Sequence, residues 1–295
     1  MTGLSQRPAS VGPCVTLACL WEATAAKPGN VHRGADFEDM THGDFVTAAA
    51  AIGPVFDSAA ERPLGELVLH AVQVMRQAVG VNTHLGTILL IAPLAKAAAQ
   101  DKAPLADVAT ELVRQSTVAD AELVYEAIRL ASPGGMGRVD EADVTTSPQI
   151  TLLDAMALAA DRDLVARQYV SGFQEVREIA GVIQNGAKWG GPLNDAIVHA
   201  HVWQMARQPD SLIARKCGAG AAERSSAYAA QALAARQVGQ AEYNAAVADL
   251  DFWLRCDGHR RNPGTTADLV GAALFLLLAE GLPRWPVRFF GAIDG

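Results

Sequence analysis

The chain has 295 residues, and its 24 basic residues stand against 32 acidic ones, which gives a formal net charge of -8. This balance argues against a broad nucleic-acid surface, because such a surface needs a clustered basic excess, although a few arginines and lysines can still converge on a small anionic ligand. Half of the residues are hydrophobic and only 6% are aromatic, and the length suffices for one large domain or two.

Helical periodicity, punctuated by Pro and Gly, runs through almost the whole chain, and abundant alanine and leucine favour helix. We expect a disordered tail at 1–13 and helices at about 14–26, 43–60, 64–79, 86–100, 105–115, 118–131, 149–160, 164–184, 192–207, 218–236, 240–255 and 266–281. Only PVRFF, residues 286–290, suggests a strand. Because neither a fixed-period repeat nor a linker-like change in composition is present, the sequence predicts one compact all-α domain over residues 14–295.

The sequence indicates a cytoplasmic protein with no membrane partner. Gly12 and Pro13 interrupt the apolar run near the N-terminus, which argues against a signal peptide. The most apolar stretch, residues 269–279, is shorter than the roughly 20 residues that cross a bilayer and therefore predicts a buried helix. The scattered cysteines lack a CxxC pair, which favours buried reduced thiols over a zinc site. They are Cys14, Cys19, Cys217 and Cys256.

The polar residues concentrate in the junctions between the expected helices. These junctions are residues 27–40, 80–84, 132–147, 161–167, 185–195 and 257–268. Junctions expose backbone N–H groups and helix N-termini, which suit anions. The sequence therefore favours a single cleft built from these segments and suited to a phosphorylated ligand. The glycines of SPGGMG, at 132–137, also allow close backbone approach to a ligand, but the segment lacks the features of a P-loop.

The first junction, KPGNVHRGADFEDM at residues 27–40, carries more charge than a turn requires. Lys27 and Arg33 are candidates for binding phosphate. The acids Asp36, Glu38 and Asp39 are candidates for magnesium, which prefers hard oxygen ligands and often bridges to substrate phosphates. The alternative is a solvated loop whose acids cap the next helix.

The second junction contains GVNTHLG, residues 80–86. Asn82 and Thr83 are typical of a helix N-cap, and His84 would follow in the first turn. A helix N-terminus disfavours a cation, so a neutral histidine is expected there. Simple capping is the alternative interpretation. Elsewhere, Asp210 or Ser211 is expected to cap a short LIARK segment.

Two junctions in the middle of the chain carry further candidates. Asp163 and Arg167 are spaced i, i+4, which favours a surface ion pair, although Arg167 is also a candidate for substrate binding. Asn185 precedes a double glycine at an expected helix start. Asp195 and His199 share a helical face, and a carboxylate that orients a histidine suits general-base catalysis.

The last junction leads into RCDGHRRNPGTTADLV, residues 255–270. Thr265 or Thr266 is expected to cap the final apolar helix, and Asp268 would lie in its first turn. Basic residues, a Gly turn and a helix N-terminus are together what phosphate binding requires. A capped C-terminal helix without function is the alternative.

Three motifs in this order, KPGNV…DM, GVNTHLG and NPGTTADLVGAALFLL, resemble the triphosphoribosyl-dephospho-CoA synthases. The similarity extends from about residue 15 to 281. It implies an all-α transferase in which a ribose hydroxyl of 3'-dephospho-CoA attacks C1' of the ribose of ATP, adenine leaves and the triphosphate is retained. Carboxylates near an oxocarbenium-like transition state would stabilise its positive charge. Mg²⁺ is the implied cofactor, and ATP and dephospho-CoA are the implied substrates.

The resemblance assigns roles to the matching positions. The catalytic candidates are Asp39, His84, Asp195 and His199. The candidates for substrate binding are Lys27, Gly29, Asn30, Arg33, Asn82, Thr83, Arg167, Asn185, Asn262, Gly264, Thr265 and Asp268. The expected metal ligands are Asp36 and Asp39.

The chain also departs from the family pattern. It has Leu85 where a lysine usually follows the Asn-Thr-His motif, and Asp36 to Glu38 where a histidine usually precedes Asp-Met. Two alternatives therefore stay open. One is a related ATP-dependent ribosyl or nucleotide transferase that acts on another cofactor precursor in one-carbon metabolism. The other is a non-catalytic helical nucleotide-binding protein. An oligomer is compatible with either.

Overall fold

The computed structural model describes residues 10–100, 103–133, 144, 146–188, 191–282 and 285–291, without the side chains of residues 187 and 188. The glycines at 134, 135 and 137 and most of the expected tail lie outside these residues. The first helix begins at Val11, so residues 11–13, which were expected in the tail, are helical instead.

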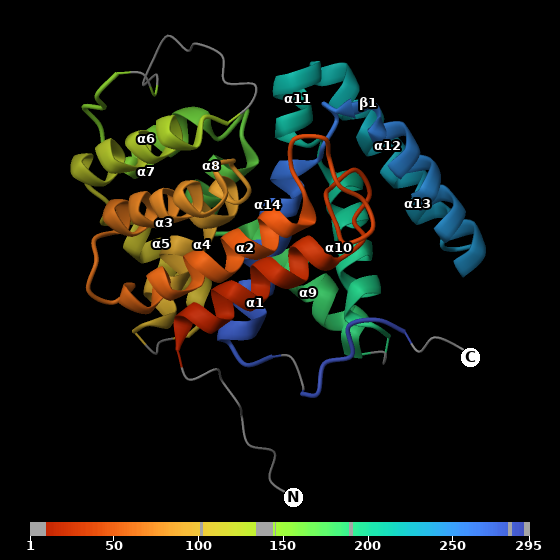
Figure 1. Ribbon diagram of the computed structural model, residues 1–295, viewed down its shortest axis with the longest axis horizontal. Coiled ribbons are helices and arrows are strands. Elements are labelled where there is room, and N and C mark those ends of the chain that lie inside the picture. The colour runs from red at the N-terminus through yellow and green to blue at the C-terminus, as the bar shows by residue number, and fades with distance from the viewer. Residues whose placement is uncertain are drawn as a thin grey trace, which may run out of the picture.

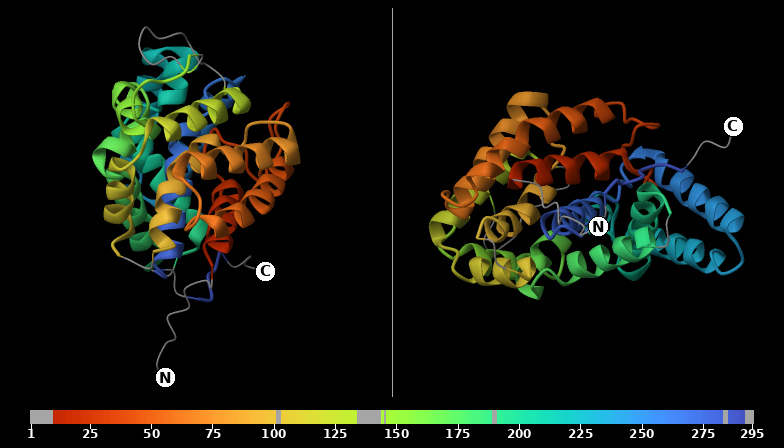
Figure 2. Two further views of the ribbon diagram at one scale, coloured as in Figure 1. Left: turned by 90° about the vertical axis from the view of Figure 1, so that its left-hand side faces the viewer. Right: turned by 90° about the horizontal axis from the view of Figure 1, so that it is seen from below.

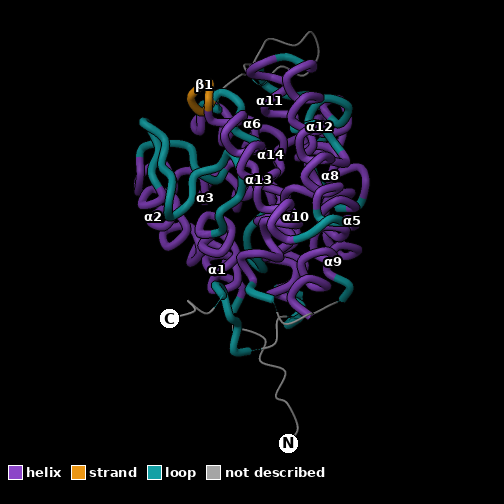
Figure 3. The backbone as a smooth tube through the Cα atoms, turned by 90° about the vertical axis from the view of Figure 1, so that its right-hand side faces the viewer, coloured by secondary structure: helices purple, strands orange, loops and turns teal. Residues whose placement is uncertain are grey.

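The expectation of an all-α fold is confirmed. The first half contains α1 (Val11–Thr24), α2 (His42–Ile52), a 3-10 helix (Gly53–Ser58), α3 (Leu64–Val79), α4 (Leu85–Ala98), α5 (Leu105–Arg114), α6 (Val118–Ala131) and α7 (Leu152–Ala159). The second half contains α8 (Leu164–Ser171), α9 (Gln174–Lys188), α10 (Leu193–Arg207), α11 (Ser211–Cys217), α12 (Ala219–Ala235), α13 (Gln240–Arg255), β1 (Cys256–His259) and α14 (Gly264–Ala279). Figure 3 shows how small a part of the described chain β1 is.

Two expected helices are each broken into two. The helix expected at 164–184 ends at Gly172, whose φ of 69° is left-handed, and Phe173 follows with a φ of 59°. The helix expected at 43–60 continues as the 3-10 helix after Ile52. The expected strand at 286–290 has no regular secondary structure, because its carbonyl groups accept hydrogen bonds from the first residues of α10 instead of from a strand.

Helix α14 is the central element of the bundle. Thirteen of its 16 residues are buried, as expected for a helix that is apolar on all sides. It packs against α1, α4, α9 and α10, and these helices surround it when the molecule is seen from below (Figures 1 and 2). The apolar stretch at 269–279 therefore forms a buried helix, as predicted.

A second, smaller apolar cluster lies beside the main core. Helices α12 and α13 form a hairpin that projects from the bundle (Figures 1 and 2), and α12 packs against α10 and α11. The cluster includes Val202 and Met205 of α10, Ala229 of α12 and Leu250 and Leu254 of α13, all nearly inaccessible to solvent.

None of the described helices combines the length and the apolar character needed to cross a bilayer. All four cysteines are free thiols. The expectation that they are buried is confirmed for Cys14 and Cys19 and wrong for Cys217 and Cys256, which are half-buried and exposed.

Candidate active site

A cavity of about 870 Å³ lies between the helices and the loops that join them. Five of the six polar junctions predicted from the sequence contribute to its lining: 27–40, 80–84, 132–147, 161–167 and 257–268. The described residues of the sixth, 185–195, do not line it. The expectation of one shared cleft is confirmed for the five junctions and wrong for the sixth.

Three helices present their N-terminal ends to this cavity. Gly86 and Thr87 lie in the first turn of α4, Val165 in that of α8, and Gly264 and Thr265 in that of α14. The first turn of a helix carries a partial positive charge that favours an anion. At each of these three ends an acidic side chain already accepts a hydrogen bond from a backbone N–H group of the first turn. A ligand anion would therefore interact with the partial charge and with the N–H groups that these acids leave unpaired.

The side chains that line the cavity include basic and apolar groups beside acidic and uncharged polar ones. The basic ones are Arg76, Arg162, Arg215 and Lys216. Burial lowers the pKa of the Lys216 ammonium group, and the neighbouring Asp39 carboxylate opposes this shift. The apolar ones come mainly from α6 and α7 and include Tyr125, Ile128, Ala155, Met156 and Leu158. The cavity therefore offers basic groups to an anion and apolar surface to a less polar group.

Lys27, expected to bind phosphate, lies behind the cavity. Its side chain is fully buried, and Nζ is 2.8 Å from Oε1 of Glu22. Nζ also donates to the backbone carbonyls of Glu22 and Ala25. Glu22 itself lines the cavity. The ammonium group therefore balances the charge of a cavity carboxylate.

The turn that follows Lys27 is held by α13. Gly29 has a φ of 75°, and a Cβ there would lie 2.7 Å from Leu254. Its N–H donates to Oδ1 of Asp251 at 2.7 Å. Gly29 is therefore required by the turn itself, whereas the next residue, Asn30, lines the cavity and donates to Oδ1 of Asn262 at 2.6 Å.

The charged residues of the first loop separate into two groups. Asp39 lines the cavity, and its Oδ2 is 3.5 Å from Nε2 of His259, which also lines it. The exposed Arg33 points elsewhere and lies over the Phe290 ring, 4.3 Å from the centroid. The Asp36 carboxylate accepts a hydrogen bond from the His42 backbone N–H at 2.6 Å. Arg33 and Asp36 do not line the cavity.

In the second motif, Asn82 and Thr83 line the cavity and His84 does not. Oδ1 of Asn82 accepts from the Leu85 N–H at 3.1 Å, so Asn82 makes the capping contact predicted for this motif. His84 occupies the N-cap position and is buried, with Nε2 3.3 Å from the Phe45 carbonyl oxygen. Burial lowers its pKa, which agrees with the expected neutral imidazole. The hydroxyl of Thr83 has no hydrogen-bond partner among the described residues, so the expected Thr83 cap is wrong.

In the third motif, Asp268 binds the start of α4. Its Oδ1 accepts from the Thr87 N–H at 2.9 Å and from the Thr87 hydroxyl at 2.8 Å. Burial raises the pKa of Asp268 to about 8, and the nearby Glu22 contributes in the same direction. Asn262, Gly264 and Asp268 all line the cavity.

The start of α14 differs from the prediction in two respects. The N-cap of α14 is Pro263, not Thr265 or Thr266. Asp268 comes one residue after the first turn. Thr265 lines the cavity and accepts from the Ser211 hydroxyl at 3.1 Å, so this threonine joins α14 to α11 rather than capping its own helix.

The comparisons with known proteins agree with this geometry. Residues 8–286 match the family model CitG, described as ATP:dephospho-CoA triphosphoribosyl transferase. The chain belongs to this family. None of the curated proteins matches it. A solved structure from Archaeoglobus fulgidus, described as a candidate triphosphoribosyl-dephospho-CoA synthase, is 29% identical with a TM-score of 0.65, over 80% of this chain and 99% of that chain.

Several residues expected to contribute to a transferase site lie outside the cavity lining. Asn185 and Asp195 are exposed on α9 and α10, and Asp195 accepts from Nδ2 of Asn194 at 2.9 Å. His199 instead contacts the Tyr243 hydroxyl, 3.4 Å from Nδ1. Burial, with a smaller effect of Arg236, lowers the pKa of His199 to about 4. Asp195 and His199 thus lie near Tyr243 of α13, and the cavity lining includes neither of them nor Asn185.

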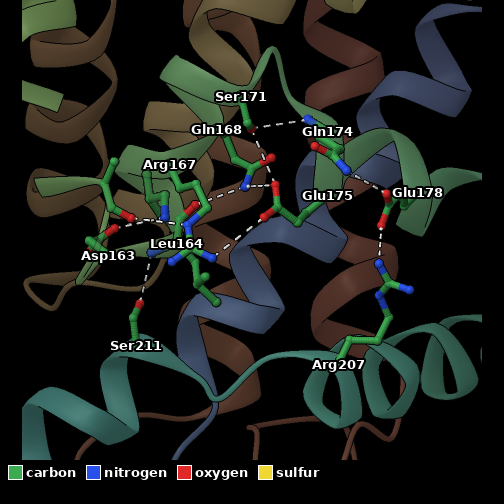
Figure 4. A network of polar contacts seen from close by, with 12 residues as sticks. Asp163, Leu164, Arg167, Gln168, Ser171, Gln174, Glu175, Glu178, Arg207 and Ser211 are labelled. Carbon is green, nitrogen blue, oxygen red and sulfur yellow. Dashed lines mark hydrogen bonds and ion pairs between the residues drawn. The ribbon is translucent and has the colours of Figure 1, made fainter. Parts of the chain in front are cut away.

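The ion pair expected between Asp163 and Arg167 does not form. Asp163 caps α8 and pairs with Arg215 of α11. Arg167 instead donates to the Ala160 carbonyl at 3.2 Å and lies 3.9 Å from Oε1 of Glu175, which links α8 to α9 (Figure 4). Asp163 lines the cavity, and Arg167 does not.

Sequence reasoning missed several residues of the site. Thr87 pairs with Asp268 across 181 positions, a separation at which no local pattern signals a contact. His259, Arg215 and Lys216 lie in the segments RCDGHRRNPGTTADLV and LIARK, but neither segment indicated a role for these side chains in the cavity. Only Glu22 gave a signal, as an isolated acid in an otherwise apolar helix.

Proposed function

We propose that this chain transfers the triphosphoribosyl group of ATP to 3'-dephospho-CoA and releases adenine. Membership in the family of ATP:dephospho-CoA triphosphoribosyl transferases carries the proposal. It is supported by a cavity that is lined by the starts of α4, α8 and α14, by several basic side chains and by apolar side chains. Such a cavity suits a triphosphate beside less polar groups of a second substrate.

In this proposal the triphosphate of ATP lies at the helix starts, near Arg215 and Lys216. Asn30 and Asn262 both line the cavity and hydrogen-bond to each other. In this proposal the two side chains together bind the ribose. The apolar side chains of α6 and α7 would contact the acceptor. Arg76 and Arg162 are further candidates for the acceptor's phosphates.

The reaction exchanges one bond at C1' of the ATP ribose for another. The bond from C1' to adenine breaks, the bond from C1' to the acceptor hydroxyl oxygen forms, and the hydroxyl proton is balanced by one taken up by adenine. Positive charge develops at C1' as adenine leaves, so carboxylates in the cavity stabilise the transition state. The role of the protein is to position both substrates and to supply these groups.

In this proposal Mg²⁺ binds together with the triphosphate of ATP. Among the described residues, no group of three His, Cys, Asp or Glu side chains converges on a metal-binding position. Mg²⁺ is commonly held by one or two carboxylates together with substrate phosphates. Asp39 fits such a role, because it lines the cavity and its side chain is 63% exposed. The Asp36 carboxylate instead accepts a hydrogen bond from the His42 backbone N–H.

The test is to incubate the purified protein with ATP and Mg²⁺, with and without dephospho-CoA, and to separate the products by liquid chromatography with mass detection. We expect adenine and a triphosphoribosylated dephospho-CoA in equal amounts, and only when both substrates are present. Intact ATP after prolonged incubation would overturn the proposal.

A second candidate function is the same transfer to a different acceptor. Leu85 lies in the cavity wall, at the position where the resemblance predicts lysine, so this part of the wall lacks a positive charge that an acidic acceptor would use. Adenine release with another cofactor precursor, and none with dephospho-CoA, would favour this candidate.

Replacing Asp39 with asparagine is expected to lower kcat/KM for ATP by about 10-fold or more, because the carboxylate charge toward Mg²⁺ and C1' is lost. The melting temperature should change little, since surface substitutions usually cost within about 0.5 kcal/mol. The matched control is Asp36→Asn in the same loop, which should retain activity. Equal losses in the two variants would count against a specific role for Asp39.

A further inference from the structure

Two carboxyl groups from distant parts of the chain meet in the same part of the cavity wall. Glu22 comes from α1 and Asp268 from α14, and both line the cavity. Both lie near Gly271, where a Cβ would be 3.6 Å from Cγ of Glu22 and 3.1 Å from Cγ2 of Thr87, the residue that Asp268 binds. A pair of acids at one place in a cavity is a common arrangement for chemistry at a sugar carbon.

The two acids have different surroundings. Nζ of the fully buried Lys27 lies 2.8 Å from Glu22, and this ammonium group balances a negative charge on the Glu22 carboxylate. Among the described residues no cation pairs with Asp268, and burial raises the pKa of its carboxyl group to about 8. This shift favours the protonated form of Asp268 at neutral pH. Environments that separate two carboxyl groups in this way indicate which is the acid and which is the base.

The hydrogen bonds of Asp268 indicate which of its oxygens carries the proton. Oδ1 accepts from both the N–H and the hydroxyl of Thr87, so the proton lies on Oδ2. A Cβ on Gly86 would be 2.1 Å from Oδ2, and Gly86 also lines the cavity. The Asp268 carboxyl group therefore occupies the space that a side chain at position 86 would fill, so this glycine is needed for Oδ2 to reach its place at the start of α4.

We propose that Glu22 and Asp268 are catalytic residues of the transfer, with Asp268 as the general acid toward adenine and Glu22 as the carboxylate beside C1'. This inference rests on the proposed function. As the bond from C1' to adenine breaks, Asp268 gives its Oδ2 proton to the departing base. Glu22 stabilises the positive charge on the ribose and takes the proton of the acceptor hydroxyl as the new C1'–O bond forms. The two groups regain their initial states by proton exchange with water.

A purely structural role for each acid predicts different behaviour. Glu22 would then serve only to neutralise the buried Lys27, and Asp268 would serve only to hold Thr87 at the start of α4. A variant can distinguish the structural role from the catalytic one if it removes the reason for which the fold needs the acid but still lacks the carboxyl group.

The first experiment compares Glu22→Gln with the double variant Glu22→Gln/Lys27→Met. The single variant leaves a buried ammonium group without its partner and should melt at a lower temperature. The double variant removes both charges and should regain melting temperature, yet adenine release should stay at least about 100-fold below wild type. Recovery of activity in the double variant would overturn the role of Glu22. The control is Glu111→Gln, which removes an exposed partner of Arg114 and should keep full activity.

The second experiment measures kcat against pH for the wild type and for Asp268→Asn. Asn retains an oxygen for the Thr87 donors but cannot give a proton. A group that acts as an acid is active below its pKa, so wild-type kcat should fall as the pH rises through about 8. Other ionisable groups near Asp268 are Glu22 on α1, Cys19 on α1 and Asp210 before α11. The substitution Asp268→Asn leaves these three groups unchanged.

The variant should lose about 100-fold in kcat at pH 7, and the decline above pH 8 should disappear. A variant with the wild-type pH profile, or with undiminished kcat, would overturn the role of Asp268. The exposed Asp249→Asn on α13 is the control. If the wild type releases adenine and these variants match it, only this inference fails. If the wild type releases none, the proposed function fails and this inference fails with it.

Discussion

Replacing Lys27 with methionine is expected to lower the free energy of unfolding by about 3–5 kcal/mol, because it leaves the Glu22 carboxylate buried without its partner. The Lys27 side chain is fully buried and that of Glu22 is only 7% exposed, so water cannot replace the lost contact. Two backbone carbonyls, those of Glu22 and Ala25, also lose their donor. Chemical denaturation followed by circular dichroism measures the effect.

The matched control is Arg114→Met, which breaks an ion pair whose side chains are 66% and 60% exposed. Exposed pairs contribute between about 0 and 1 kcal/mol, so this variant should unfold almost as the wild type does. Similar losses in the two variants would show that burial does not set the strength of the Lys27–Glu22 pair. The result also decides between two roles for Lys27, since a phosphate ligand at the surface would affect KM and leave stability unchanged.

Replacing Asp210 with alanine is expected to cost a similar amount, about 3–5 kcal/mol. Oδ1 accepts from the N–H groups of Leu212 and Ile213 and so caps α11. Oδ2 accepts from the N–H and the hydroxyl of Thr266, at 2.7 and 2.8 Å. Thr266 is completely buried, so both of its donors would lose their partner where water does not reach.

The control for Asp210 is Thr151→Ala, which removes the exposed cap of α7. Loss of an ordinary cap costs about 1 kcal/mol, and the difference between the two variants measures the link between α11 and α14. Because α11 carries Arg215 and Lys216 to the cavity, Asp210→Ala should also weaken ATP binding. A melting temperature equal to that of Thr151→Ala would show that Asp210 acts as a cap and nothing more.

The sequence was sufficient to predict features that depend on local pattern. The apolar stretch at 269–279 predicted a buried helix because an amphipathic surface helix would have polar residues on one side. The polar junctions predicted the cleft because Gly, Pro and Asn mark the helix ends at which backbone groups are free. Both inferences use information within a few residues, and the structure bears out the buried helix and five of the six junctions.

The features that the sequence could not predict depend on contacts between distant residues. Lys27 follows an alanine and precedes a Pro-Gly turn, a pattern typical of an exposed lysine, yet α1 places Glu22 against it. Asp163 and Arg167 are at helical spacing, but the Asp163 carboxylate pairs instead with Arg215, which is 52 positions away in the sequence. The break at Gly172 lacks a proline, so the helical pattern continues through it. In each case tertiary packing overrides a local preference.

The attachment of the first loop to α13 has a consequence for substrate affinity. The Asp251 carboxylate accepts a hydrogen bond from the Gly29 N–H, and Arg255 donates one to the Asn30 carbonyl. The turn that brings Asn30 to the cavity is thus ordered when the hairpin packs. Ordering a loop on binding reduces affinity, because conformational freedom is lost at that moment. Here the loop loses its conformational freedom when the protein folds, so ligand binding does not have to order it.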